Sequence, residues 1–242
     1  LLFFNIYFQP IKLKWNQYSL DVLKMSWPLT LGFMASWTYI SINSVMLGYF
    51  NLIIENGWYT AASKIAIVSV IPATLIIKSF YPMLSNFYIS SKEKLQKSWN
   101  FFMELMIFLT MPIIVTIVVL APKIIDTFYG ISFYPSILAL QLLIFVVGTS
   151  FISFPYSVML VVADQQKKNF ALIVAGAVIN IVLNFIFIPI FGFYGTIIST
   201  IIASLFFLFS TMALSKYLTH IHLFDKKLLG VILISTFASI MM

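Results

Sequence analysis

Three charged side chains fall inside long apolar segments, where a charge is costly to bury: Lys64, Lys78 and Glu104. A charge near the centre of a bilayer costs about 2.5–3.5 kcal/mol on insertion scales, so each of the three is a candidate functional residue. Lys64 and Lys78 lie on one predicted helix, and their spacing leaves them only about 40° apart around its axis. The two lysines therefore share a face, where their ammonium groups could bind phosphate as point charges.

Each of these charges also has a structural interpretation. Both lysines could extend to a membrane interface along their aliphatic stems, and for Lys78 we favour that interpretation. For Lys64 we favour a substrate-binding cavity, because Asn43 on the preceding antiparallel segment should lie at a similar depth. Glu104 is expected at the depth of Lys78, which predicts a structural ion pair. Glu104 is also the only carboxylate within a complete predicted span, so it is the sole candidate for ion coupling here.

A stripe of small and polar residues, Gly176, Asn180 and Asn184, recurs at every fourth position of another apolar segment. Such stripes usually allow helices to pack closely and form hydrogen bonds with one another. We therefore interpret this stripe as a packing surface, with substrate contact as the alternative.

Motifs for catalysis or for cofactor binding are not found. His220 and His222 stand beside Asp225, but their spacing matches no common zinc motif, and we predict no metal site. No nucleotide-binding, serine hydrolase or metalloprotease motif occurs. The prediction is therefore a protein that is not an enzyme and has no catalytic residues and no cofactor. Any transport would be driven by ion gradients or by substrate supply.

The composition indicates a membrane protein. Of 242 residues, 62% are hydrophobic and only 9% are charged, and the mean hydropathy is +1.04. A soluble domain has about 45–50% apolar residues and about 25% charged ones. The apolar runs are long and continuous, which indicates spanning helices rather than the alternating strands of a barrel. Without cysteine, the chain has no disulfide and no thiolate site.

The apolar runs predict an all-α, polytopic transmembrane bundle with six complete spans and two partial ones. Residues 1–8 would end one helix, residues 9–25 would form a cytoplasmic linker between lobes, and residues 219–242 would form a loop and begin a further helix. Because the chain begins and ends inside apolar runs, we expect it to be a portion of a longer protein. The complete spans, within a six-helix unit of residues 26–218, are predicted at 26–47, 59–81, 99–120, 135–162, 169–190 and 195–218.

Lysine placement predicts the orientation. Alternate loops, at 9–25, 82–98, 163–168 and 215–227, hold 11 of the 14 lysines, whereas the opposite loops hold only Lys123. Because cytoplasmic loops are enriched in basic residues, we expect the lysine-rich loops in the cytoplasm. The same rule explains the net charge of +7 without a nucleic-acid partner.

Three prolines, Pro72, Pro112 and Pro155, fall near the middle of predicted spans. Proline removes a backbone hydrogen bond and kinks a helix. The kinks could serve packing or could act as hinges in a protein that changes shape.

Asn180 and Asn184 are followed along the chain by Ile188-Pro189 and then by Gly192 and Gly195. This stretch and four other segments, in order, resemble the polysaccharide-transport family, the O-antigen and lipid-linked oligosaccharide flippases of the multidrug/oligosaccharidyl-lipid/polysaccharide flippase superfamily. The family's pattern of an Asn-rich helix, Ile-Pro, a Gly-x-x-Gly turn and a small-residue helix resembles residues 171–203. The family often has Asp where this chain has Asn43. The other similar segments are 43–50, Gly57-Trp-Tyr-Thr-Ala-Ala-Ser-Lys64, Phe80-Tyr-Pro-Met-Leu-Ser85 with the lysines that follow, and 121–142.

The resemblance implies one C-terminal lobe of a two-lobed flippase in the cytoplasmic membrane. Such a protein would move a lipid-linked oligosaccharide across the bilayer by alternating access, together with an N-terminal lobe outside these residues. A multidrug or peptidoglycan-precursor transporter of the same superfamily is the nearest alternative, although cavity lysines disfavour a cationic drug. A membrane polysaccharide polymerase or acyltransferase is a more distant alternative, because the predicted loops are short. A membrane scaffold without transport activity also remains open.

Overall fold

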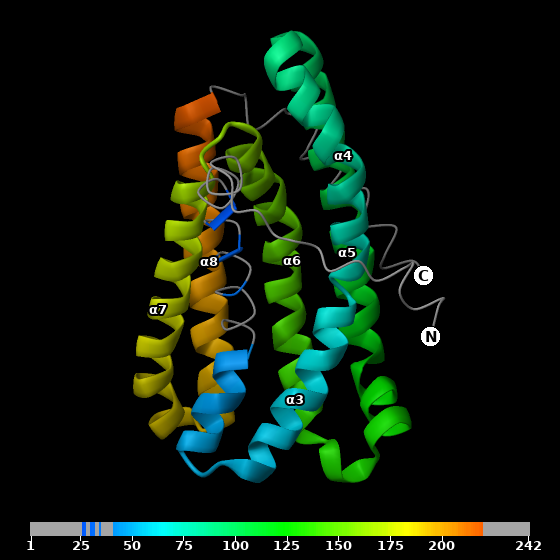
Figure 1. The fold of residues 1–242 in the computed structure, drawn as a ribbon. Coiled ribbons are helices and arrows are strands. Elements are labelled where there is room, and N and C mark those ends of the chain that lie inside the picture. Colours follow the sequence, from blue (N-terminus) through cyan, green and yellow to red (C-terminus); the bar gives the residue numbers. More distant parts are fainter. Residues whose placement is uncertain (1–25, 28–29, 32–33, 35–40, 220–242) are drawn as a thin grey trace, which may run out of the picture.

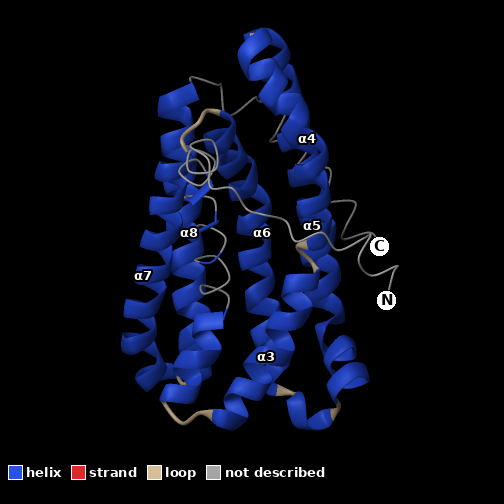
Figure 2. Ribbon diagram, in the orientation of Figure 1, coloured by secondary structure: helices blue, strands red, loops and turns tan. Residues whose placement is uncertain are grey.

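The computed structural model describes residues 26–27, 30–31, 34 and 41–219, and the regular elements in these residues are all helices (Figure 2). Residues 26–27, 30–31, 34 and 41–49 are helical. The helices that follow these residues are α3 (Ile53–Val68), α4 (Ile71–Ser90), α5 (Lys92–Tyr129), the short 3-10 helix η1 (Ile131–Phe133), α6 (Pro135–Val162), α7 (Gln166–Phe191) and α8 (Phe193–Thr219).

The described residues contain five helices that are long and apolar enough to cross a membrane, when α3 and α4 are taken together as Ile53–Ser90. The all-α membrane architecture is therefore confirmed. The last three helices match their predicted spans closely, and α6 coincides with residues 135–162. Of the first complete span, predicted at 26–47, the structure describes mainly the last residues, 41–47. The segments predicted at 1–8 and 9–25, and all but the first residue of 219–242 with its two histidines, lie outside the described residues.

Two predicted loops are helical instead. The basic segment 82–98 was expected to be a linker, but α4 continues to Ser90 and α5 starts at Lys92. Ser91 makes this sharp junction possible because its Oγ accepts a hydrogen bond from the backbone N–H of Lys94, at 3.4 Å. A serine in this position caps the free N–H groups of a new helix. At the opposite end of the bundle, α5 continues through Pro122 to Tyr129, where a loop was predicted.

The helix that contains Lys64 and Lys78 is broken between them. Helix α3 ends at Val68 and α4 begins at Ile71, with Pro72 in its first turn. Proline has no N–H to donate, and its ring clashes with the carbonyl group one turn earlier. The chain passes the break through Ser69 and Val70, whose N–H groups bond to carbonyl oxygens of α3. The two lysines therefore lie on different helices.

Helix α6 is the central element and contacts α3, α4, α5, α7 and α8 (Figure 1). Helices α7 and α8 pack against each other on one side of α6, and α4 and α5 form an antiparallel pair on the other. The largest side chains of the core come from α5 and α6, including Trp99, Phe102, Phe151 and Tyr156. Trp99 and Tyr156 join the two helices, with their ring centroids 5.3 Å apart.

The lysines of the described residues gather mainly at one end of the bundle. At the top of Figure 1, α4 passes into α5, α6 passes into α7, and α8 ends. Two turns at the other end of the bundle use glycine where the backbone has positive φ, at Gly130 (79°) and Gly192 (59°), and the turn before α3 has Asn51 in this conformation (59°). The lysine-rich end carries Lys92, Lys94, Lys97, Lys167, Lys168 and Lys216, whereas Lys123 lies toward the opposite end.

Candidate functional site

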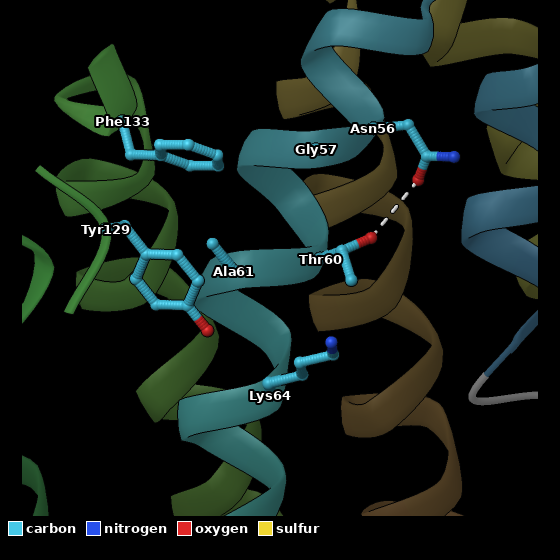
Figure 3. Close-up of a pocket in the computed structure, with 7 residues that line it drawn as sticks. All are labelled: Asn56, Gly57, Thr60, Ala61, Lys64, Tyr129 and Phe133. Carbon is cyan, nitrogen blue, oxygen red and sulfur yellow. Dashed lines mark hydrogen bonds between the residues drawn. The ribbon is translucent and has the colours of Figure 1, made fainter.

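A pocket of about 320 Å³ lies beside Lys64, at the end of the bundle away from most of the lysines (Figure 3). Its volume is at the lower limit of small-molecule sites, which span about 300–1,000 Å³. Three elements build the pocket: α3 from Asn56 to Lys64, the end of α5 and the short helix η1. It is lined by Asn56, Gly57, Thr60, Ala61, Lys64, Tyr129 and Phe133.

One side of the pocket is aromatic and the other is polar (Figure 3). The rings of Tyr129 and Phe133 form the aromatic side, with centroids 5.3 Å apart and planes inclined by 39°. On the polar side, the Thr60 hydroxyl donates to Oδ1 of Asn56 at 3.4 Å. Between the two sides lies α3, where Gly57 leaves space: a Cβ added there would have no neighbour within 4 Å.

Hydrogen bonds from Trp58 and Ser136 hold α3 in place against η1 and α6. The indole Nε1 of Trp58 donates to the carbonyl oxygen of Ser132, at 3.0 Å. The hydroxyl of Ser136 donates to the carbonyl oxygen of Trp58, at 2.9 Å. Since Trp58 follows Gly57 and Ser132 precedes Phe133, these bonds fix the two sides of the pocket relative to each other.

Lys64 is exposed and makes no ion pair with the described residues. Its side chain runs below Thr60 on the polar side of the pocket (Figure 3). An exposed ammonium group beside hydroxyl and amide groups can bind an anion through charge-assisted hydrogen bonds. Of the candidate substrate-binding residues, Lys64 is the one that the structure places in this pocket.

Lys78 and Glu104 do not form the predicted ion pair. The antiparallel contacts of α4 with α5, such as the stacked rings of Phe80 and Phe102, do place the two charges at the same level. In the part of the chain that the structure describes, however, the ion pair that forms is Lys97 with Glu93, at 2.8 Å. Lys78 is exposed and Glu104 is half-buried, and the described residues show no ion pair between them.

We therefore expect little energetic coupling between Lys78 and Glu104. In a double-mutant cycle of Lys78→Ala and Glu104→Gln, the two changes in unfolding free energy should add to within about 0.5 kcal/mol. Thermal unfolding of the purified protein in detergent would measure this. A coupling clearly above that value would mean that the pair forms after all. The role of Glu104 in ion coupling stays a prediction.

Asn43 lies at the centre of a buried network of polar side chains. It is 2% exposed, and its Nδ2 donates to the hydroxyl oxygens of Tyr59 and Thr200, each at 2.8 Å. Its Oδ1 accepts a hydrogen bond from Nδ2 of Asn184, at 2.8 Å. Asn184 also donates to Oδ1 of Asn180, at 3.2 Å. The network thus joins residues 41–49, α3, α7 and α8.

This network lies apart from the pocket. Asn43 contacts α3 at Tyr59, which is about 140° around the helix from Lys64, and Tyr59 is buried whereas Lys64 is exposed. Asn43 was expected to line one cavity with Lys64, and the structure does not bring the two together. Asn180 and Asn184 are fully buried, as a packing surface requires.

The other predicted packing and hinge residues have different surroundings. Gly176 is buried, but no atom of the described residues lies within 4 Å of a Cβ added there. Pro112 and Pro155 lie inside α5 and α6, and both helices continue through them. The hinge role of the three prolines stays a prediction, with a break in the helix observed only next to Pro72.

Sequence reasoning missed most of the residues that line the pocket and two of the five residues of the network. Asn56 and Thr60 precede Lys64 at intervals of four residues, so helical spacing could have placed them on one face with it. Spacing cannot connect Tyr129 and Phe133 with Lys64, because these two residues lie on other helices. Tyr59 and Thr200 gave no signal of their own, because buried partners on distant helices cannot be recognised from spacing.

A sequence model of the polysaccharide biosynthesis protein family matches residues 1–138, which is more than half of the chain. The matched residues include all seven that line the pocket. No curated protein and no solved structure matches the chain significantly. By this match, the chain belongs to the polysaccharide biosynthesis protein family.

Proposed function

We propose that this chain is one lobe of a transporter that flips a lipid-linked oligosaccharide across the cytoplasmic membrane by alternating access. In this proposal the pocket beside Lys64 binds the head group of the substrate, and the lysine pairs with the phosphate that links sugar to lipid. The lysine-rich end of the bundle faces the cytoplasm, as expected for basic loops. A second lobe completes the cavity.

The observation that carries this proposal is that Lys64 lies in a pocket and has no acidic partner among the described residues. A lysine within a membrane-spanning helix usually pairs with a carboxylate or lines a polar path. Lys64 has no carboxylate partner among the described residues and lies in a pocket with hydroxyl, amide and aromatic groups. Such a site favours an anionic substrate over a cationic one, and family membership supports a substrate of polysaccharide synthesis.

The break between α3 and α4 supports the interpretation that the protein changes shape. Alternating access needs elements that reorient without losing their packing, and hinges commonly lie at the ends of helices. The break at Ser69 and Val70 separates α3, which carries the pocket, from α4. The break therefore lets the angle between α3 and α4 change without unwinding either helix.

Replacing Lys64 tests the proposal. In cells that rely on the full-length protein, Lys64→Ala should lower surface polysaccharide about tenfold or more, and lipid-linked repeat units should accumulate on the cytoplasmic side. The loss corresponds to one charged hydrogen bond, about 1.5–3 kcal/mol. Lys64→Arg keeps the positive charge and should restore part of the export.

Lys123→Ala is the matched control. Lys123 is an exposed lysine toward the same end of the bundle, and it does not line the pocket. Its replacement removes one positive charge and should leave export unchanged. Normal export by Lys64→Ala, at a normal protein level in the membrane, would refute the role of the pocket in transport.

A further inference from the structure

Beyond the phosphate, we propose that the pocket binds the sugar ring next to it, with Tyr129 and Phe133 as the stacking surface. This inference rests on the proposed function and adds a specificity site that distinguishes a saccharide head group from a bare lipid phosphate. Asn56 and Thr60 bind the hydroxyl groups of the ring, while Lys64 holds the phosphate.

The chemistry of a sugar ring matches the two sides of the pocket. One face of a pyranose presents C–H groups, which are weakly positive and favour the negative face of an aromatic ring. Its edge carries hydroxyl groups, which need partners that can donate or accept hydrogen bonds. The pocket supplies the first from Tyr129 and Phe133 on one side of α3, and the second from Asn56 and Thr60 on the other (Figure 3). Nδ2 of Asn56 already donates to the carbonyl oxygen of Ser44 and its Oδ1 accepts from Thr60, which leaves one N–H and one lone pair of its amide, and the lone pairs of the Thr60 hydroxyl, for the sugar.

The two aromatic side chains are placed to act as a platform. Tyr129 and Phe133 are half-buried and pack against the hydrophobic core, which fixes their orientation. Phe128, by contrast, is 75% exposed and lies outside the pocket, as expected for an aromatic residue that only marks the membrane interface. Tyr129 thus belongs to the stacking surface, whereas Phe128, its neighbour in the chain, does not.

The space beside α3 in the pocket is open because the residues of α3 that face it are small. Gly57 and Ala61 lie between the aromatic and the polar side, and the site of a Cβ on Gly57 is empty. The Trp58 and Ser136 hydrogen bonds keep the two sides apart. The volume of about 320 Å³ suits a sugar ring with its phosphate better than a whole repeat unit.

The test compares two ligands on the purified full-length protein in detergent. One is a short polyprenyl pyrophosphate that carries a single N-acetylhexosamine, and the other is the same polyprenyl pyrophosphate without sugar. We expect the wild type to bind the sugar-bearing ligand about tenfold more tightly, as contact with aromatic rings and hydroxyl partners would give. Tyr129→Ala and Phe133→Ala should bring this ratio close to one and leave the affinity for the bare ligand unchanged.

Three further variants make the result specific. Phe128→Ala, the matched aromatic control, should keep the wild-type ratio. Gly57→Leu fills the pocket with a residue that favours helix formation, and it should abolish the preference for sugar. Lys64→Ala should weaken the binding of both ligands equally, because both carry the phosphate.

The outcomes separate this inference from the proposed function. If Lys64→Ala weakens the binding of both ligands but Tyr129→Ala and Phe133→Ala keep the wild-type ratio of the two affinities, the sugar site is refuted and the phosphate site stands. A wild type that does not distinguish the two ligands also refutes the sugar site. If Lys64→Ala weakens neither ligand, the phosphate site itself fails.

Discussion

Gly195→Ala is expected to destabilise the protein more than a methyl group added at any other glycine of these helices. A Cβ at Gly195 would collide with the backbone carbonyl oxygen of Phe187 and lie 2.7 Å from the backbone nitrogen of Ile188. These atoms belong to α7, so they cannot turn aside as a flexible side chain would. The two helices would have to separate where they are joined by the turn at Gly192.

The expected loss is about 3 kcal/mol, at the upper end of the usual cost of overpacking. For a chain of this size, that corresponds to a fall of about 10 °C in the midpoint of thermal unfolding. Thermal unfolding of the purified protein in detergent would measure it. Because α7 and α8 carry Asn184 and Thr200, their separation should also weaken the buried polar network.

Gly176→Ala is the matched control, since it adds the same methyl group to the same pair of helices. Apart from the adjacent residues and the backbone of its own helix, no described atom lies within 4 Å of its new Cβ. Alanine is favoured over glycine inside a helix by about 0.5–1 kcal/mol, so this variant should be as stable as the wild type or more stable. Equal midpoints for Gly195→Ala and the wild type would contradict the close contact of the two helices.

The sequence predicts the helices better than their ends. Apolar runs place α6, α7 and α8 within a few residues, because a bilayer demands a long apolar stretch. The junctions at Ser91 and Gly130 were missed because polar residues were taken to end a helix. Lys92 and Lys94 are good helix formers once Ser91 caps them, and Pro122 is accommodated inside α5.

The candidate site could be predicted only in part, because it depends on how helices rotate against one another. Lys64 is recognisable from its cost in a membrane, and helical spacing connects it to Asn56 and Thr60. Its aromatic neighbours, Tyr129 and Phe133, lie more than sixty residues away on α5 and η1. Asn43 is recognisable as a buried polar residue, but whether it faces Lys64 or Asn184 depends on the rotation of its helix.

Asn43→Ala is expected to have the largest effect of any change to the polar network. The substitution removes hydrogen bonds to Tyr59, Thr200 and Asn184, three side chains that lie on three other helices. Hydrogen bonds between membrane helices average about 0.6 kcal/mol each, with a maximum near 1.7. Three of them together with the cavity predict a loss of about 2 kcal/mol, measured by thermal unfolding in detergent.

The shared bonds predict that the network variants are not additive. Asn184→Ala alone removes the hydrogen bonds to Asn43 and Asn180. Once Asn43 is alanine, one of these bonds is already absent, so Asn43→Ala and Asn184→Ala together should cost about 1 kcal/mol less than the sum of the two. Asn86→Ala, an exposed asparagine on α4, is the matched control and should change nothing.

The same variants distinguish packing from substrate contact. If the network only holds helices together, Asn43→Ala should lower stability but keep the wild-type preference for the sugar-bearing ligand at temperatures where the protein is folded. Tyr129→Ala should show the reverse. A folded Asn43→Ala protein that loses the preference for sugar would place the network in the binding site. Fully additive effects of Asn43→Ala and Asn184→Ala would mean instead that the two side chains act independently, because a hydrogen bond between them cannot be lost twice.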